Sequence, residues 1–485
     1  MKSKKSLFIL IGLILIIALY FIISNLFFNK TTINEKLFGK WSGFLKTPKR
    51  QLVISADILK SKNGNVNLKI SSPKQKQYNI PTDSLVINNN LIMFSINKYK
   101  IRYKGIINLD STKIIGTWYQ DNFISELDFY RPDEILRTGH PQYPVKPYPY
   151  NNDSVYFFNY IDSINLAGTI TYPKKNKQKY PAILLINGLG KHDRDETMYG
   201  HKPFLLISDY LTRKGYVVFR ADDRGVGKSG GKFEKATTKD FTRDMISALK
   251  YLKTKSYVDT NKIGIIGFNE GGLIAARIAS ESDNVKFIIL LSTPGITGKE
   301  ILLTQTVDIQ EKSGIPDNVI QRDLKINKKI LNIVGSIKDS ALAYNKLRNT
   351  YRQFRATLPK EDLVKKKYSI VAFKNQLNFM LTPWFKYYLN YNPKKTFTKI
   401  KIPVLIIYGD KDVQVNAAKN NNALRRALEQ AGNKNYKSII FPNLNHLLQH
   451  CQTGLPNEYA KISQTVSPAV LDSINVWLNN IKTKL

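Results

Sequence analysis

A segment in the middle of the chain has the spacing of a nucleophile elbow. Gly267 and Gly271 flank Phe268, Asn269 and Glu270, after a strand-like run and before a helical one. Glycines at these positions let the chain turn sharply and expose the middle side chain at the edge of a sheet, in a strained conformation. The middle position of such an elbow carries a serine nucleophile, but here it is Asn269.

The elbow and four other segments follow one another in an order typical of one enzyme family. The four match its oxyanion loop, its R-x-D-x-R-G-x-G-x-S turn, its acid-bearing turn and its histidine-bearing loop, and they are residues 187–196, 220–229, 409–415 and 444–446. On these segments, residues from about 150 to 485 resemble the esterase-type α/β-hydrolases related to the serine aminopeptidase family. The resemblance implies hydrolysis of a carboxylic ester, a small-molecule ester-like ligand, and neither a metal nor a cofactor.

The resemblance also assigns catalytic roles. It implies that Asp412 orients His446, that His446 takes the proton of the nucleophile, and that the backbone N–H groups of Leu189 and Glu270 form the oxyanion hole. The chain order of elbow, acid and histidine independently supports this arrangement. Trp384 fits the lid of such proteins, where it would contact an apolar or aromatic acyl group, although core packing explains it equally well.

Two of these residues have competitors nearby. Asp410 competes with Asp412, which is favoured because Val-Gln-Val follows it as in the family. His450 competes with His446, which is favoured because it follows Leu444-Asn445 at the start of the family's loop pattern.

Three further residues near the motifs are predicted to play no catalytic part. His192 is expected at the surface, Arg224 is expected to pin loops together, and Cys451 is expected to be inert because it lies off any elbow.

Asparagine at the elbow changes the chemistry. A carboxamide nitrogen is not a nucleophile at neutral pH, because its lone pair is delocalised into the carbonyl. Loss of the nucleophile from such a triad costs about 10⁶ in kcat, while the oxyanion hole leaves about 10³–10⁴ over water. The serine route is therefore predicted to be lost or strongly impaired.

Several interpretations stay open. In the first, the protein is a pseudoenzyme that binds a ligand or partner. In the second, His446 and Asp412 activate water directly, with Asn269 orienting it. In the third, Asn269 is a one-base change in an active esterase. Deamidation of Asn269 to Asp is disfavoured by the bulky Glu270 after it. A separate interpretation is an envelope protein that binds a ligand or partner through its N-terminal β domain.

Alternating strands and helices must position these residues. Strand-like runs at 180–187, 216–222, 262–267, 286–291, 404–408 and 438–441 alternate with helical patterns, which predicts a mostly parallel, doubly wound α/β-hydrolase sheet. Residues from about 299 to 392 contain no strand-like run, and we expect them to form a helical lid.

A different pattern precedes the hydrolase region. Residues 52–58, 66–70, 91–96 and 103–107 alternate with period two, which predicts a small antiparallel barrel or meander of seven or eight strands. Trp41 and Trp118 are expected to fill its core rather than to bind a ligand. The chain resembles esterases that carry such an extra domain, and the predicted organisation is 1–30 anchor, 31–132 β domain, 133–150 linker and 151–485 hydrolase domain.

The N-terminus predicts a membrane anchor. Three lysines precede an apolar run at residues 7–23, which is long enough to span a bilayer and longer than a typical signal-peptide core. No small-x-small cleavage site follows, so an uncleaved transmembrane helix is favoured over a cleaved signal peptide. The leading lysines predict a body on the periplasmic or extracellular side; the alternative is secretion after cleavage.

Composition excludes other classes. The net charge is +37, but its lysines are spread along the whole chain, so nucleic-acid binding is not predicted. The single cysteine, Cys451, excludes an internal disulfide and a cysteine-based metal site. The oligomeric state is left open.

Overall fold

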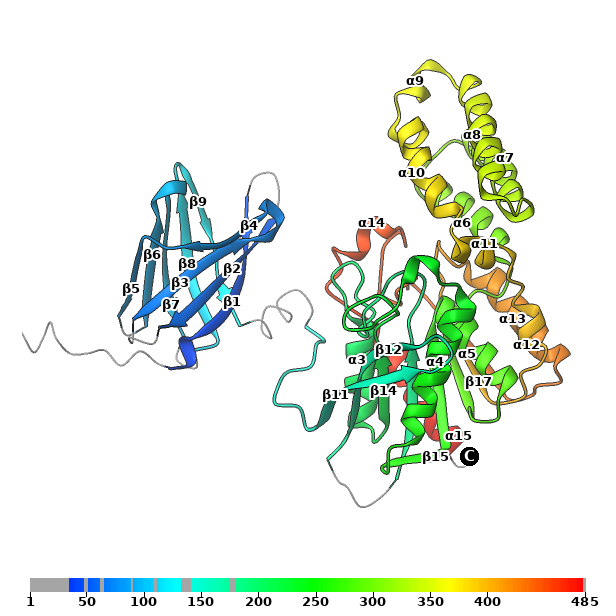
Figure 1. Cartoon of the computed structure of the whole chain (residues 1–485), viewed down its shortest axis with the longest axis horizontal. Coiled ribbons are helices and arrows are strands. Elements are labelled where there is room, and N and C mark those ends of the chain that lie inside the picture. Colours follow the sequence, from blue (N-terminus) through cyan, green and yellow to red (C-terminus); the bar gives the residue numbers. More distant parts are fainter. Residues whose placement is uncertain are drawn as a thin grey trace, which may run out of the picture. The chain divides into compact units, whose positions relative to one another are not determined.

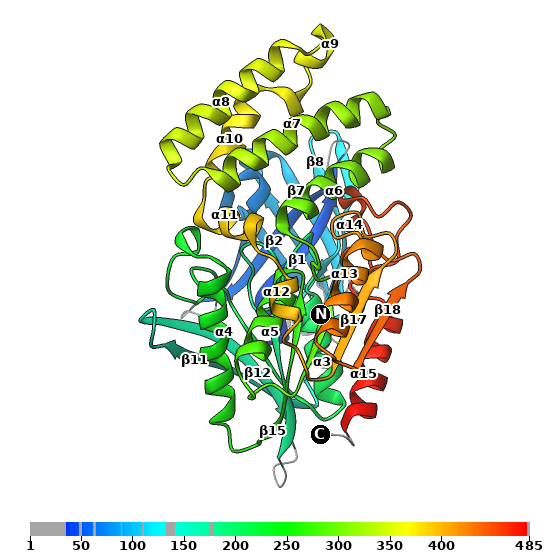
Figure 2. The same ribbon diagram turned by 90° about the vertical axis from the view of Figure 1, so that its right-hand side faces the viewer.

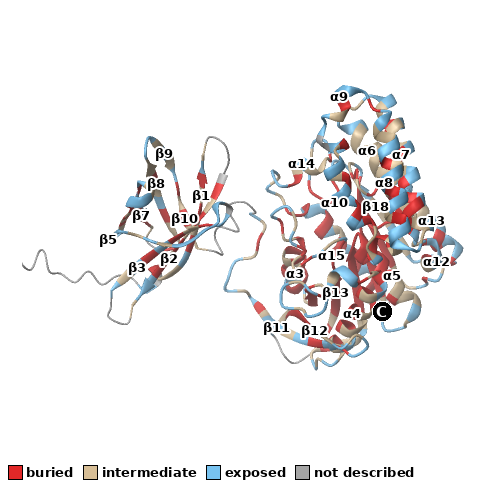
Figure 3. Ribbon diagram, turned by 45° about the horizontal axis from the view of Figure 1, so that its top comes forward, coloured by how far each residue is buried: buried red, intermediate tan, exposed pale blue. Residues whose placement is uncertain are grey.

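The computed structural model describes residues 35–482 apart from 48–50, 62–64, 89, 109–110, 132–140 and 175–178. The chain divides into two compact units, Met1–Gly139 and His140–Leu485 (Figure 1). Each unit has its own hydrophobic core (Figure 3). The predicted anchor at residues 7–23 lies outside the described residues. Within the described part, no helix is long and apolar enough to cross a membrane.

The first unit is an antiparallel sheet that curls around an apolar interior (Figure 1). Its strands run in the order β4-β3-β2-β1-β10-β8-β7-β6-β5, with β9 paired to β8. Inward and outward side chains alternate as the sequence predicted, and Trp41 and Trp118 are buried. The strands are β1 (Gly39–Lys46), β2 (Gln51–Lys60), β3 (Val66–Ser72), β4 (Gln77–Pro81), β5 (Ser84–Asn88), β6 (Leu91–Ile96), β7 (Ile101–Ile107), β8 (Lys113–Gln120), β9 (Phe123–Glu126) and β10 (Phe129–Tyr130).

The prediction of seven or eight strands was too low for this unit. β9 and β10 span only four and two residues, and so short a stretch carries too little alternation to be recognised.

The second unit is built on an eight-stranded sheet in the order β11-β12-β14-β13-β15-β16-β17-β18. The six predicted strands are all present and parallel, and two further strands, β11 and β12, join antiparallel at one edge. The strands are β11 (Tyr150–Asn159), β12 (Ile164–Pro173), β13 (Tyr180–Ile186), β14 (Val217–Ala221), β15 (Val258–Phe268), β16 (Phe287–Leu291), β17 (Val404–Gly409) and β18 (Tyr436–Phe441).

Helices cover both faces of this sheet, so its central strands are buried on both sides. The core on one face includes side chains of α4 (Thr238–Lys253), α5 (Glu270–Glu281) and α13 (Ala417–Gln430). The core on the other face includes side chains of α3 (Pro203–Arg213) and α15 (Pro468–Lys482) (Figure 2). This is the α/β-hydrolase architecture that the sequence predicted.

The predicted helical insertion is also present, with no strand between residues 299 and 392. Figures 1 and 2 show α7, α8 and α10 projecting away from the sheet, beyond α11. The helices are α6 (Gly298–Lys312), α7 (Asp317–Ser336), α8 (Ser340–Ala356), α9 (Lys360–Leu363), α10 (Ile370–Met380), α11 (Pro383–Asn390) and, just after them, α12 (Lys394–Phe397). α11 contacts α4, α6 and α7, and so joins the insertion to the sheet layer.

Part of the predicted linker is fixed to the second unit. The amide of Gln142 donates to the carbonyl of Val466 at 2.7 Å, and the hydroxyl of Tyr143 donates to the carbonyl of Gly200 at 3.2 Å. The described end of this segment is therefore packed against the second unit, which covers the predicted hydrolase domain and is referred to as the hydrolase unit.

Candidate active site

The elbow has a strained backbone. Asn269 stands between the end of β15 and the start of α5, with φ 47° and ψ −115°. A Cβ on Gly267 would lie 2.3 Å from the backbone carbon of Gly271, so strand and helix approach more closely than a side chain allows. The N–H of Asn269 donates to the carbonyl of Leu291 at 2.9 Å, which ties the elbow to β16.

The three residues predicted to act together lie together. The Nδ1 of His446 is 2.7 Å from Oδ2 of Asp412, and its Nε2 is 2.9 Å from Nδ2 of Asn269. The other carboxylate oxygen of Asp412 accepts the backbone N–H groups of Gln414 and Val415, each at 2.8 Å. All three side chains are buried, and they come from loops after β15, β17 and β18.

The competing residues, Asp410 and His450, are both exposed. His450 faces the side chain of Gln464 at 2.9 Å. The geometry therefore favours Asp412 and His446 over both.

These contacts define the hydrogen bonding of the histidine. Because the carboxylate of Asp412 can only accept, Nδ1 of His446 carries the proton in this pair. Nε2 then offers a lone pair, which accepts the amide N–H of Asn269. The amide oxygen of Asn269 is buried and has no hydrogen-bond partner among the described residues.

The predicted oxyanion loop packs against the elbow. A Cβ on Gly188 would lie 2.7 Å from the ring of Phe268, so the two segments are in close contact. Glu270 is the first residue of the twelve-residue helix α5, whose N-terminus favours a developing negative charge. Leu189 is followed by Gly190, with φ 119°. The role of Leu189 and Glu270 in an oxyanion hole stays a prediction.

The expectation that His192 lies at the surface was wrong, because its side chain is buried under the oxyanion loop. Its Nε2 donates to the carbonyl of Leu189 at 2.8 Å. Asp223 accepts the backbone N–H of His192 at 2.9 Å, and Glu196 accepts that of Gly188 at 3.0 Å. Burial raises the pKa of Glu196 and of Asp223 to about 8.

No role was predicted for the side chain of Glu196, although the Asp-Arg-Asp-Glu run that ends at Glu196 was visible in the sequence. A charged residue in a polar loop gives no sign that folding will bury it.

Trp384 is held by Glu270, the residue that follows Asn269 in the elbow. Its indole N–H donates to the carboxyl oxygens of Glu270 at 3.0 and 3.1 Å, and Thr238 donates to the same carboxyl at 2.5 Å. Burial raises the pKa of Glu270 to about 7, although both hydrogen bonds oppose the shift. Trp384 is buried and stacks on Tyr388. Its predicted contact with a substrate stays a prediction.

Arg224 pins loops together, as predicted. Its guanidinium contacts Asp244 at 2.7 Å and Asp162 at 2.9 Å, and only 8% of the arginine side chain and 2% of the Asp244 side chain is exposed. A second pair, Arg194 and Asp222, lies at 2.6 Å and anchors the oxyanion loop to the end of β14. The loops around the elbow are thus held by buried charge pairs.

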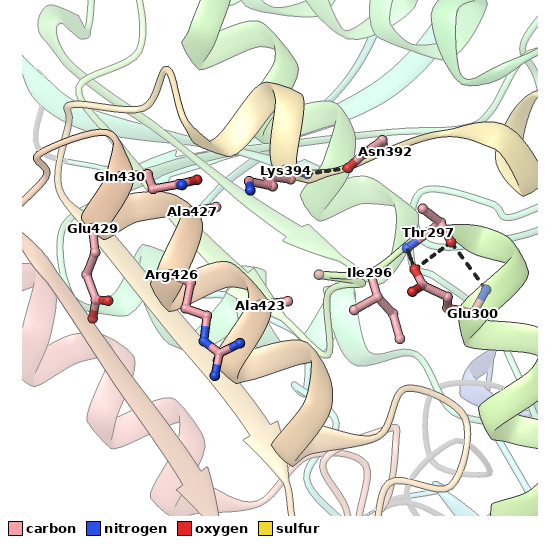
Figure 4. A pocket seen from close by; sticks show the side chains of 11 residues that line it. Ile296, Thr297, Glu300, Asn392, Lys394, Ala423, Arg426, Ala427, Glu429 and Gln430 are labelled. Atoms are coloured by element: carbon pink, nitrogen blue, oxygen red, sulfur yellow. Dashed lines mark hydrogen bonds between the residues drawn. The ribbon is translucent and has the colours of Figure 1, made fainter.

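Two other features lie apart from this centre. The pocket in Figure 4 has a volume of about 760 Å³ and is lined by residues of α6, α12, α13 and the adjoining loops, none of them Asn269, Asp412 or His446. Burial raises the pKa of the Cys451 thiol to about 11, which keeps it protonated and agrees with an unreactive residue.

A family model and several known proteins match the sequence of this chain. A family model described as serine aminopeptidase, S33, matches residues 182–450. Esterase EstD of Thermotoga maritima is 26% identical over 317 residues, which are 64% of this chain and 65% of EstD. Dipeptidyl-peptidase 5 of Porphyromonas gingivalis is 28% identical over 139 residues, which are 28% of this chain and 19% of that enzyme. The chain thus covers less than two thirds of the length of either relative.

Solved structures are similar at lower identity. Esterase Pf2001 of Pyrococcus furiosus is 18% identical and covers 68% of this chain and 91% of its own, with a TM-score of 0.41. Est1E of Butyrivibrio proteoclasticus, solved with ferulic acid, is 19% identical and covers 67% and 98%, with a TM-score of 0.39.

Proposed function

Because the chain belongs to the serine aminopeptidase S33 family, we propose that its hydrolase unit binds a small carboxylic-ester-like molecule and does not cleave it by the serine route. One observation carries the proposal: the amide of Asn269 donates to Nε2 of His446 at 2.9 Å. The side chain at the nucleophile position therefore occupies the lone pair that would act as general base.

The chemistry follows from this contact. An ester carbonyl placed at the elbow would meet the N–H groups of Leu189 and Glu270, which polarise it. Asn269 cannot attack it, and His446 cannot take a proton from water while its Nε2 accepts the amide. The site thus keeps recognition and loses the nucleophile, which costs about 10⁶ in kcat in triads of this type.

The test compares the native protein with Asn269→Ser, each with and without His446→Ala, on p-nitrophenyl acetate, butyrate and octanoate. We expect hydrolysis only in Asn269→Ser, with its loss on adding His446→Ala. His450→Ala in the Asn269→Ser background is the matched control and should leave the rate unchanged, because His450 is exposed and bonded to Gln464.

Binding is measured separately. Calorimetric titration of the native protein with the same esters should give a Kd of the same order as the KM of Asn269→Ser. No binding by the native protein would overturn the proposal, and so would native hydrolysis that disappears with His446→Ala.

That second outcome would support the alternative, in which His446 and Asp412 activate water. One observation favours it: the buried amide oxygen of Asn269 has no partner in the described structure and could accept a hydrogen bond from such a water. This route needs the amide to turn away from Nε2 first.

We also propose that residues 7–23 anchor the protein in a membrane and that the body faces the periplasmic or extracellular side. The support is the apolar run and the lysines before it. Carbonate extraction of membranes should leave the protein in the pellet, and protease added to spheroplasts should digest its body. A mature N-terminus beyond residue 28 would instead indicate cleavage and secretion.

A further inference from the structure

The first unit, Met1–Gly139, is referred to as the β unit and encloses a hollow that the proposed hydrolase site does not use. Its volume is about 680 Å³, within the range of about 300–1,000 Å³ typical of small-molecule sites. Packed protein interiors leave few voids larger than a water molecule. A space of this size inside a curled sheet is therefore a consequence of the fold and not a packing defect.

The wall of this hollow is apolar. It is formed by inward-facing side chains of strands that are distant in sequence, chief among them Leu52, Ile54, Ile70, Ile96, Ile101 and Trp118. Each is at most 7% exposed. No ionisable side chain stands among these six, so the wall suits a hydrocarbon body.

The polar lining residues gather at one end. The antiparallel pairings give β1, β3, β6 and β8 the same direction, so the turns that follow them meet at one end of the sheet. Each of those turns contributes a polar lining residue, and these are Thr47, Gln75, Tyr99 and Asp121. The hollow thus has aliphatic walls and a polar ring at one end.

The polar ring is hydrogen-bonded and close to neutral. Gln77 and Gln120 also line the hollow beside these four residues. Gln77 accepts from the hydroxyl of Tyr99 at 3.2 Å, and Gln120 accepts from the indole of Trp118 at 3.3 Å. Asp121 is paired with Lys100 at 3.0 Å, which cancels the acidic charge of the ring. The ring thus presents amide and hydroxyl groups to a polar head.

We propose that this hollow binds a single-chain acyl amphiphile, with the alkyl chain against the aliphatic wall and the polar head at the ring of turns. The shape favours a small molecule over a protein partner, because the apolar surface lies inside the curled sheet. All residues that line the site belong to the β unit. Binding of an amphiphile there can therefore be tested independently of catalysis at Asn269.

Protection of an introduced thiol tests the site in the full-length protein. Cys451→Ser removes the single native cysteine, and Ile101→Cys then places a thiol on the wall. Ile106→Cys is the matched control, because Ile106 lies on the same strand but faces outward and is 54% exposed. The two thiols are labelled with a maleimide, with and without dodecanoic acid or monododecanoylglycerol.

With ligand at about ten times its Kd, labelling of the Ile101→Cys thiol should slow about tenfold, and labelling of the Ile106→Cys thiol should not change. Protection by the acid alone or by the glyceride alone identifies the head group. Equal labelling rates with and without both ligands, at the solubility limit of each, would overturn the proposal.

A filling variant gives an independent readout. Ile70→Phe adds volume to the wall, and we expect it to weaken binding of a fluorescent dodecanoate analogue about tenfold, with Ile106→Phe as the outward control. Thermal unfolding checks that both variants are folded. A folded Ile70→Phe protein that binds as tightly as the native one would contradict the site.

Discussion

At the scale of single residues, the elbow is built around Asn269, whose carboxamide is not a nucleophile. Its φ of 47° and ψ of −115° form a strained conformation for any residue that carries a side chain. The close packing of β15 against α5 around the elbow holds Asn269 in this conformation. The pair of Asp412 and His446 keeps its geometry beside it.

The acid can be identified by mutation in the Asn269→Ser background. Asp412→Asn is expected to lower kcat by about 10⁴, because an amide at this position stabilises the wrong histidine tautomer. KM should change little, since Asp412 would not touch the ester. Steady-state kinetics on p-nitrophenyl butyrate give both values.

Asp410→Asn is the control for that measurement, because Asp410 is exposed and the carboxylate bonded to His446 is that of Asp412. A larger loss from Asp410→Asn than from Asp412→Asn would refute the assignment of the acid.

Glu270 should make stability depend on pH. Its ordinary pKa is 4.5, and burial raises it to about 7 in the folded protein. Between these values the folded protein holds a proton that the unfolded chain has released, so the free energy of unfolding falls as pH rises. Glu270→Gln should remove the contribution of Glu270 to this fall, which is up to about 3 kcal/mol between pH 4.5 and pH 7.

Urea unfolding of the native protein and of Glu270→Gln between pH 5 and pH 8 checks the sign. Glu196 and Asp223 have raised pKa values as well, so the slope of the variant should be shallower than the native slope but still negative. Parallel slopes for the two proteins would exclude Glu270 as a contributor.

At the scale of elements, the site depends on loops held at the carboxyl ends of parallel strands. Arg224 joins the turn after β14 to α4 through Asp244 and to the loop after β11 through Asp162. The hydrogen bonds of the sheet do not extend into these loops. Buried ion pairs fix the positions of the loops instead.

Arg224→Met should therefore lower the free energy of unfolding by about 3–5 kcal/mol, because it leaves the buried carboxylate of Asp244 without its charged partner. Chemical denaturation measures the loss. The double variant Arg224→Met with Asp244→Leu should recover much of it, since no charge is then left buried.

Arg425→Met is the matched control. Its partner, Glu429, lies 3.9 Å away and both side chains are about half exposed, so stability should be almost unchanged. If both arginine variants had the same small effect, the buried pair would not be a structural support.

At the scale of the whole molecule, the two units have separate cores. The apolar core of the β unit consists of residues from Leu37 to Phe129, and the two cores of the hydrolase unit begin at Phe157 and Ile183. Each unit is large enough to bury a core of its own.

A protein comprising residues 140–485 is therefore expected to fold and to show one cooperative transition in calorimetry, at the same Tm as in the full-length chain. In the Asn269→Ser background, its hydrolysis of short esters should be unchanged. Failure of this piece to fold would show that the β unit is required for the stability of the hydrolase unit.

Local patterns in the sequence were enough to predict the six parallel strands, the alternating β unit, the helical insertion and the family, because each leaves a periodicity or a motif within a few residues. The antiparallel strands β11 and β12 were not predicted. In β11 the polar run Asn151-Asn152-Asp153-Ser154 interrupts the alternation that marks a strand.

Tertiary structure alone decided the rest. The motifs predicted that Asn269 and His446 act together, but only the tertiary structure made the amide of Asn269 the donor to Nε2 of His446, 177 residues away in sequence. It also buried His192 and joined Trp384 to Glu270. It also opened the hollow between strands of the β unit. Each of these features depends on which side chains, distant in sequence, come into contact when the chain folds. A pattern within a few residues carries no information about such contacts.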